Sequence, residues 1–329
     1  MINNIGIVGL GSIGCRHLIL ARELRSDLNI IAVRSRKGKK IEEEKLVDSV
    51  VYSLEDAIDC GIEAAIIATP AVYHVQQAIK LMEKGIHVLI EKPLSHSLHN
   101  LTELLKVNKK TKTVALVGYC LRYNSGALKF FDIINSKKIG QILHVQVDCG
   151  SYLPDWRKGT DYRESVSAKA ELGGGVLLEL SHELDYIRWF FGEMKSVSAK
   201  IQNSGTLDIN VEDSVDMIFS SEQGYSVSVH LDFNIRKTRR KCTARCSNGD
   251  LTWDAIDNML IWQSVDGIKE VETYQNDHNY IYREQLKHFF DCIENKKRPL
   301  VSLDDGAIVL NMIESAKKSH KIGKKVAVA

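Results

Sequence analysis

The stretch Asn4-Ile-Gly-Ile-Val-Gly-Leu-Gly-Ser-Ile-Gly14 decides the fold of this chain. An apolar run over residues 5–8 predicts a buried strand, and the glycines after it are spaced as Gly-x-Gly-x-x-Gly. Residues 15–24 then have the pattern of a helix. This order of strand, glycine turn and helix is typical of a Rossmann fold, in which a dinucleotide's pyrophosphate rests on the helix N-terminus. A purely structural glycine turn is the alternative interpretation.

Outward from this stretch, short apolar runs alternate with amphipathic segments through the first third of the chain. Further strands are expected over residues 29–33, 64–68, 87–90 and 113–118, with a helix over 73–84. Alternation of strands and helices predicts a parallel sheet with right-handed crossovers. We therefore predict an α/β fold whose first domain, residues 1–121, is a doubly wound Rossmann sheet.

The pattern changes after this point. Residues 142–149 and 225–233 alternate apolar and polar side chains with a period of two, which predicts strands with one polar face. Helices are expected over 176–191 and 280–294 on the other face, and a closing helix over about 304–318 could pack back on the first domain. We predict that residues 122–329 form an α+β domain on an open, predominantly antiparallel or mixed sheet.

The bulk composition is that of a globular enzyme. At 329 residues the chain exceeds what one hydrophobic core usually supports, and its net charge of +2 gives no reason to expect a nucleic-acid or membrane partner. Seven scattered cysteines without a Cys-x-x-Cys pair argue against disulfides and against a metal site. We see no signal segment and no apolar run of about 20 residues, so a cytoplasmic protein is expected.

The glycine turn predicts the phosphate site. Gly9 permits a tight turn, Gly11 lets the backbone approach a pyrophosphate, and Gly14 allows close packing of helix and strand. The backbone amides of Ser12 and Ile13, at the helix N-terminus, are expected to bind the phosphates.

The end of the second strand predicts the cofactor. NAD-specific sites usually place an acid about 20 residues after the glycines, but none occurs between Asp27 and Glu42. The residues that follow the strand are basic or hydroxylated instead: Arg34, Ser35, Arg36 and Lys37. Such groups suit a 2′-phosphate, with charge-assisted bonds of roughly 1.5–3 kcal/mol each, which favours NADP(H). If the stretch is only a solvated basic loop, NAD(H) binds as well.

The remaining strand ends carry the reactive side chains. Ligands of an open α/β sheet lie outside the carboxyl ends of its strands. The residues expected there beside the cofactor are Thr69, Pro70, His74, Glu91 and Lys92. A lysine that ends a buried strand, between a carboxylate and Pro93, is placed to reach a bound nicotinamide. A surface lysine in a turn is the alternative.

These segments resemble the glucose–fructose oxidoreductase and inositol dehydrogenase family, also called Gfo/Idh/MocA. The matching segments are Gly9–Gly14 with Arg16-His17, Ala65–Pro70 with His74, Gly85–Pro93, Gly173–Gly175 leading to His182 and Asp185, and Asp304–Gly306. The resemblance implies hydride transfer at a carbinol carbon, a Lys92 that hydrogen-bonds the reacting oxygen, and a cis bond before Pro93. It also implies a homodimer or homotetramer formed through the C-terminal sheet.

A second catalytic group is expected in the helix over 176–191. Glu179, His182 and Asp185 are spaced i, i+3, i+6, so successive members are neighbours on one helix face. We predict that His182 acts as general acid or base, oriented by these carboxylates. The family usually has an aspartate four residues before this histidine, where the chain has Leu178. A core histidine, and an ion-pair role for Asp185, are the alternatives.

The substrate pocket is expected to contain aromatic and basic side chains. Besides Lys92 and His182, the candidates are Arg122, Tyr152, Trp156, Arg157, Tyr162 and Arg163. Aromatic faces stack on sugar rings and arginine grips carboxylates or phosphates, which predicts a sugar, cyclitol or nucleotide-sugar-like substrate. A surface loop is the alternative for the stretch over 152–163. For the whole chain, the competing functions are an imine reductase, a glycosidase with a retained cofactor, and a non-catalytic NAD(P)-binding redox sensor.

Overall fold

The computed structural model describes residues 2–36, 40–136, 138–275 and 277–328. The chain divides into two compact units, each made of two segments. The first unit contains Met1–Cys120 and Asn279–Ala307, and the second contains Leu121–His278 and Ile308–Ala329. Compared with the domains expected from the sequence, the segment 279–307 belongs to the first unit instead of the second.

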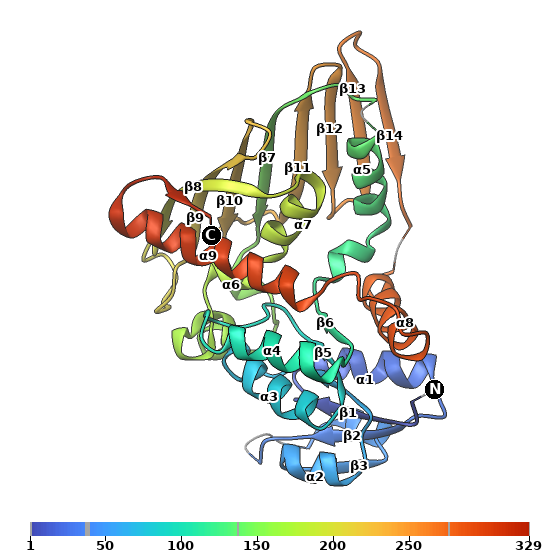
Figure 1. The fold of residues 1–329 in the computed structure, drawn as a ribbon. Helices are drawn as coiled ribbons and strands as arrows, with labels where there is room; N and C mark the ends of the chain where they lie inside the picture. The colour runs from blue at the N-terminus through green and yellow to red at the C-terminus, as the bar shows by residue number, and fades with distance from the viewer. Residues whose placement is uncertain (1, 37–39, 137, 276, 329) are drawn as a thin grey trace. The chain divides into compact units, whose positions relative to one another are not determined.

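The first unit contains a parallel sheet in the order β3-β2-β1-β4-β5-β6 (Figure 1). Its strands are β1 (Asn4–Val8), β2 (Asn29–Val33), β3 (Ser49–Val51), β4 (Ala64–Ile67), β5 (His87–Ile90) and β6 (Ala115–Val117). All neighbouring pairs are parallel. The strand order reverses between β1 and β4, which is where open α/β sheets bind ligands. The predicted doubly wound Rossmann sheet is confirmed.

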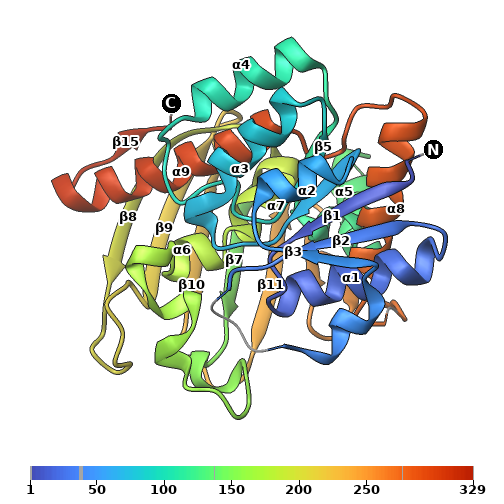
Figure 2. The same ribbon diagram turned by 90° about the horizontal axis from the view of Figure 1, so that it is seen from below.

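Helices cover both faces of this sheet. Helix α1 (Ser12–Leu24) packs with α8 (Tyr280–Glu294) on one face, and α3 (Ala71–Glu83) and α4 (Leu101–Thr111) pack on the other (Figure 2). The helix α2 (Leu54–Asp59) and the 3-10 helix η1 (Glu42–Leu46) complete the unit.

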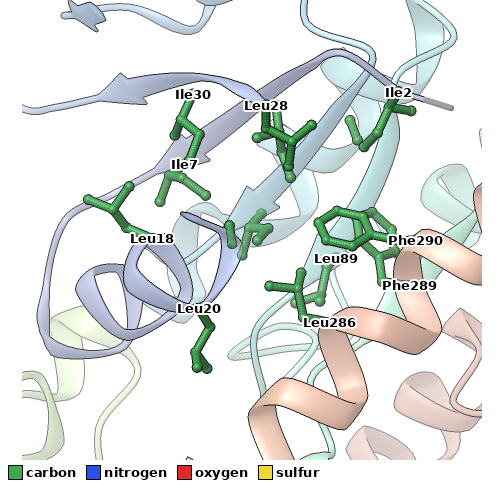
Figure 3. Close-up of a cluster of buried hydrophobic side chains, with 14 of the residues drawn as sticks. Ile2, Ile7, Leu18, Leu20, Leu28, Ile30, Leu89, Leu286, Phe289 and Phe290 are labelled. Carbon is green, nitrogen blue, oxygen red and sulfur yellow. The ribbon is translucent and has the colours of Figure 1, made fainter. Parts of the chain in front are cut away.

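Helix α8 is part of the first unit's core. Its residues Leu286, Phe289 and Phe290 pack in one apolar cluster with Ile7 and Leu18 (Figure 3). The sequence placed this helix against the second sheet, and that expectation was wrong. Its apolar stripe showed that one face is buried, but the stripe carries no information about which sheet covers it.

The second unit contains a mixed sheet in the order β14-β13-β12-β11-β7-β10-β9-β8-β15. Its strands are β7 (Ile142–Gly150), β8 (Met194–Gln202), β9 (Ser214–Ser221), β10 (Ser226–Asp232), β11 (Arg239–Cys246), β12 (Gly249–Asp254), β13 (Met259–Ser264), β14 (Lys269–Thr273) and β15 (Val326–Ala327). β7 and β10 are parallel, and the other neighbours are antiparallel. This confirms the predicted open sheet of predominantly antiparallel strands.

Helices lie on one face of the second sheet. They are α5 (Ser125–Asn135), α6 (Val176–Glu179), α7 (His182–Phe191) and α9 (Leu303–Ile322), of which the residues from 308 onward belong to this unit (Figure 1). Aromatic rings join helices to sheet: Phe130 and Phe190 lie 4.8 Å apart, and Tyr186 and Trp253 lie 5.2 Å apart. Among the described residues, no helix is both long enough and apolar enough to span a membrane.

Candidate functional site

The three glycines of the turn after β1 meet different surroundings. Gly9 has φ +92°, and Gly14 lies so close to the Gly9 carbonyl that a methyl group there would collide with it. Both are therefore required by the fold. A Cβ atom built on Gly11 meets nothing within 4 Å, so this position is open to a ligand. That difference fits the predicted role of Gly11 beside a pyrophosphate.

A cavity of about 470 Å³ adjoins this turn. Its lining includes Gly11, Ser12, Cys15, Arg16, Ile41 and Glu43. The free amides at the N-terminus of α1, those of Ser12 and Ile13, attract an anion. Four of these residues were not candidates from the sequence: Cys15, Arg16, Ile41 and Glu43. Cys15 and Arg16 nevertheless share the helix face of Ser12. Burial is the main cause that raises the pKa of the Cys15 thiol, which is therefore neutral.

The end of β2 is less basic than the sequence suggested. Arg34 forms an ion pair with Glu44 of η1, and Glu44 also accepts a hydrogen bond from the Ile41 amide at 3.0 Å. A carboxylate therefore reaches this strand end from ten residues further along the chain. The Arg36 guanidinium lies 5.4 Å from the centre of the Tyr52 ring. Ser35 follows Arg34 directly, and Lys37 lies outside the described residues.

His74 joins the loops that follow β4 and β5. It is buried, with Nδ1 2.9 Å from the Pro93 carbonyl and Nε2 2.7 Å from the Thr69 carbonyl. Burial is the main cause that lowers the pKa of His74, so a neutral ring donates to one carbonyl at a time. Both ring nitrogens face backbone carbonyl groups of the chain itself, so His74 connects the two loops. Pro70 occupies the position before the first residue of α3.

The end of β5 presents Lys92. The Lys92–Pro93 bond is cis, as the family resemblance implied. Lys92 is half-buried, whereas Glu91 and His17 behind it are buried and paired, with Nε2 and Oε1 2.7 Å apart. Lys92 therefore stands at the boundary between core and solvent, at the carboxyl edge of the sheet.

The predicted helix over 176–191 is interrupted. Glu179 is the last residue of α6 and His182 the first of α7, because the backbone leaves helical geometry at Leu180 (φ −99°, ψ 33°). The expectation that Glu179, His182 and Asp185 share one face of one helix was wrong. His182 is buried, with 8% of its surface exposed.

Asp185 faces Arg122. The guanidinium makes two bonds to this carboxylate, Nη2–Oδ1 at 2.7 Å and Nε–Oδ2 at 3.0 Å, and both side chains are buried. The sequence had assigned Arg122 to the substrate and Asp185 to His182, with an ion-pair role for Asp185 as the alternative, and this ion pair is observed. The structure instead gives each of them the other as partner, and direct roles in binding or catalysis stay predictions.

A second ion pair, between a buried carboxylate and a partly exposed guanidinium, also holds α7, and sequence reasoning missed it. Glu183 is fully buried, and its Oε1 lies 2.8 Å from Nε of Arg240 on β11. Burial, as the main cause, raises the pKa of the neighbouring Cys149 thiol, which stays protonated. No local pattern marked this pair, because its members lie 57 residues apart.

Several of the predicted substrate side chains in the loop over 152–163 contact other residues of the chain. Trp156 donates to the Ser151 hydroxyl at 2.6 Å, and the Arg236 guanidinium lies 3.6 Å from the centre of the Tyr152 ring. Exposed Arg163 pairs with Asp161 at 2.7 Å. Arg157 is exposed, and the Tyr162 hydroxyl accepts from the Asp208 amide at 3.4 Å.

Models of one protein family match the chain over nearly its whole length. "Oxidoreductase family, NAD-binding Rossmann fold" matches residues 3–119, "GFO/IDH/MocA C-terminal domain" matches 128–252, and "Oxidoreductase family, C-terminal alpha/beta domain" matches 235–328. The chain belongs to the GFO/IDH/MocA oxidoreductase family. The resemblance seen in the sequence is thereby confirmed.

Similar proteins share this scaffold. The 2,7-anhydro-N-acetylneuraminate hydratase of Mediterraneibacter gnavus is 28% identical over 57% of this chain and 49% of its own length, so the chain spans about half of that relative. The 1,5-anhydro-D-fructose reductase of Ensifer adhaerens is 22% identical over 92% of both chains. A levoglucosan dehydrogenase in complex with NADH superimposes with a TM-score of 0.87 at 18% identity, covering 99% of both chains, which shows a shared fold.

Proposed function

We propose that this GFO/IDH/MocA chain is an NAD(P)-dependent oxidoreductase that interconverts a carbinol and a carbonyl group on a sugar, cyclitol or nucleotide-sugar-like substrate. The observation that carries the proposal is Lys92, half-buried at the carboxyl end of β5, in the same unit as the open glycine turn. Relatives named for 1,5-anhydro-D-fructose and levoglucosan support a sugar-like substrate.

The first unit fits a dinucleotide. Gly11 leaves room for the pyrophosphate, and the N-terminal amides of α1 supply its hydrogen bonds. When bound, the nicotinamide supplies the hydride donor or acceptor. In our proposal Lys92 donates a hydrogen bond to the reacting oxygen, and His182 of the second unit holds or releases the proton. Glu179 remains the candidate carboxylate for His182, and Asp185 holds α7 through Arg122.

The proposal is tested by a panel of hexoses, cyclitols, sugar acids and nucleotide sugars, following the absorbance of reduced nicotinamide. Lys92→Met should lower turnover by about 10² or more while cofactor binding is kept. Lys84→Met, an exposed lysine in the same unit, is the matched control. If Lys92 and His182 act in one step, the double variant with His182→Asn loses little more than either single variant.

Two outcomes favour other functions. Cofactor binding without any chemistry, unchanged by Lys92→Met, would identify a redox sensor. Turnover without net oxidation of the cofactor would identify a retained-cofactor enzyme, which is a second candidate because one relative is named as a hydratase. A hydratase adds or removes water, which leaves no net oxidation.

For the cofactor we propose NADP(H), with Arg36 as the residue on which the preference depends. Arg34 is already paired with Glu44, whereas Arg36 lies beside the exposed Tyr52 ring. Arg36→Ala should weaken NADP(H) binding by about tenfold or more and NAD(H) binding much less. Arg25→Ala, at the other end of α1, is the control. Equal losses for both cofactors would remove the preference and leave NAD(H) as the cofactor.

We propose that the open face of the second sheet forms a homodimer or homotetramer. This face exposes the apolar side chain of Ile218 (54%) on β9. Light scattering should give an oligomer that Ile218→Lys dissociates; a monomeric parent chain would contradict this. A cytoplasmic location is proposed from the seven cysteines, all of which are free.

A further inference from the structure

Helix α1 carries a histidine on its buried face. The residues of this face that point to the sheet include Gly14, His17, Leu18 and Ala21, spaced three and four apart. His17 has 0% of its surface exposed at a position where an apolar side chain would be usual. The Arg16-His17 pair was marked by the sequence, but neither residue has a part in the proposed function so far.

We propose that His17 is a positioning residue: it fixes the Glu91 carboxylate, and through it the Glu91–Lys92–Pro93 segment that presents Lys92. The contact is His17 Nε2 to Glu91 Oε1 at 2.7 Å, between residues 74 positions apart in the chain. It runs from the helix after β1 to the end of β5, past the intervening strand β4. The inference rests on the proposed role of Lys92.

The Glu91 carboxylate is held at both oxygens. While Oε1 meets His17, Oε2 accepts a hydrogen bond from the Lys92 backbone amide at 3.2 Å. A Cβ atom built on Gly118, at the end of β6, would lie 3.0 Å from both Oε2 and the Lys92 nitrogen. The carboxylate therefore cannot rotate without losing its bonds, and a change in its position moves the Lys92 backbone.

Within α1, His17 is the buried hydrogen-bond partner of the Glu91 carboxylate. The groups packed around this pair are an aromatic ring and a cation. Tyr282 of α8 packs edge-on against the His17 ring, at 6.2 Å between centroids, and the Arg16 guanidinium lies 4.6 Å from the centre of the Tyr282 ring. Cys120, burial and Glu91 together raise the pKa of the Tyr282 phenol, in that order, so it is neutral. A buried carboxylate such as that of Glu91 is stable only when it has hydrogen-bond partners, and His17 is one of them.

Helix α1 thereby contacts both parts of the first unit's site. Its first turn offers the amides of residues 12–14 to the phosphates, and its second turn holds Glu91 through His17. A rigid helix that touches both fixes the distance between the phosphate site and Lys92.

The test compares His17→Leu, which removes the donor, with His17→Gln, which keeps an N–H. Leu18→Ala is the matched control, because it weakens the same buried face without touching Glu91. Hydrogen exchange is measured on the peptide over residues 87–95. His17→Leu should accelerate its exchange by about tenfold, while His17→Gln and Leu18→Ala leave it close to the parent protein. Turnover should fall by about 10–100-fold in His17→Leu and recover in His17→Gln.

Two further readouts separate positioning from stability and from cofactor binding. The dissociation constant for NADH should change by less than about threefold in His17→Leu. Glu91→Gln, which removes the carboxylate charge next to Lys92, should move the pH profile of kcat/KM towards lower pH, a shift that a purely structural residue would not cause.

Three results would overturn the inference. They are equal exchange in His17→Leu and Leu18→Ala, a loss of NADH affinity that parallels the loss of turnover, and an unchanged pH profile in Glu91→Gln. The exchange measurement needs no substrate. If the parent protein turns over none of the substrate panel, the proposed function fails while the positioning of the Lys92 segment is still decided.

Discussion

The end of β5 and the start of α7 solve the same structural problem in different ways. Each presents one candidate catalytic side chain, Lys92 or His182, at the end of a secondary-structure element. At β5 the neighbouring carboxylate is held by an imidazole, that of His17. At α7 two carboxylates are held by guanidinium groups, those of Arg122 and Arg240.

This difference has an energetic consequence. An imidazole can be neutral, so a buried histidine that loses its partner leaves no full charge behind. A guanidinium is always charged, and burying it without its carboxylate is costly. Loss of the Glu91 carboxylate would therefore leave an imidazole that can be uncharged, whereas loss of a carboxylate at α7 leaves a guanidinium without its counter-charge.

The largest expected effect tests this contrast at α7. Asp185→Leu should lower the free energy of unfolding by about 3–5 kcal/mol, because Arg122 stays buried without this carboxylate. The double variant Arg122→Met/Asp185→Leu should recover most of the loss, since both charges are gone. Urea denaturation of the single and double variants measures the difference.

The control is an exposed ion pair in the same unit. Arg163 and Asp161 are both exposed, with 52% and 42% of their side chains accessible. Arg163→Ala should leave the unfolding midpoint unchanged. If Asp185→Leu is equally silent, or if the double variant is no more stable than the single one, the ion pair does not hold α7.

The same contrast explains what the sequence revealed. The glycine turn and the Glu91-Lys92-Pro93 segment are contiguous, and each follows an apolar run that predicts its strand. Their position at the carboxyl edge of the sheet follows from the parallel order alone. These parts of the candidate site were therefore predictable residue by residue.

The pairings were not predictable, because the fold chooses the partner. Arg122 and Asp185 are 63 residues apart, and their chemistry alone suits a ligand as well as each other. Glu44 of η1 pairs with Arg34, but it lies further along the chain than the position, about 20 residues after the glycines, at which such an acid is expected. The break at Leu180 was not predictable either, since the apolar pattern continues across it.

A second experiment separates a glycine that the fold needs from one that a ligand needs. Gly14→Ala places a methyl group against the Gly9 carbonyl and should destabilise the first unit by about 2 kcal/mol or more. Gly11→Ala meets no protein atom, and its φ of −78° suits any residue. It should change stability by less than about 0.5 kcal/mol but weaken NADH binding by about tenfold.

Thermal unfolding and calorimetric titration with NADH distinguish the two variants. A Gly11→Ala protein that binds NADH as tightly as the parent would show that the turn does not receive the pyrophosphate. A Gly14→Ala protein of normal stability would mean that the turn can shift, and that the glycine spacing is not imposed by packing.

The smallest expected effect concerns Glu212, a half-buried carboxyl that differs from the buried ones of Glu183 and Asp185. Its Oε1 accepts a hydrogen bond from the Leu177 amide at 3.2 Å, at the start of α6. Burial, as the main cause, raises the pKa of Glu212 above its ordinary value of 4.5, and the hydrogen bonds and Lys317 oppose the shift only in part. Folding therefore favours the protonated form of Glu212 more than the unfolded chain does.

The sign of the pH dependence follows from this. Stability from Glu212 is fully present below its ordinary pKa and is lost as the pH rises through the raised one. Each step of one in pKa corresponds to about 1.4 kcal/mol. Glu212→Gln keeps an acceptor but cannot ionise, so its stability relative to that of the parent should rise as the pH rises above 4.5. If the stability of the two proteins depends on pH in the same way, then hydrogen bonds and Lys317, and not burial, determine the ionisation of Glu212.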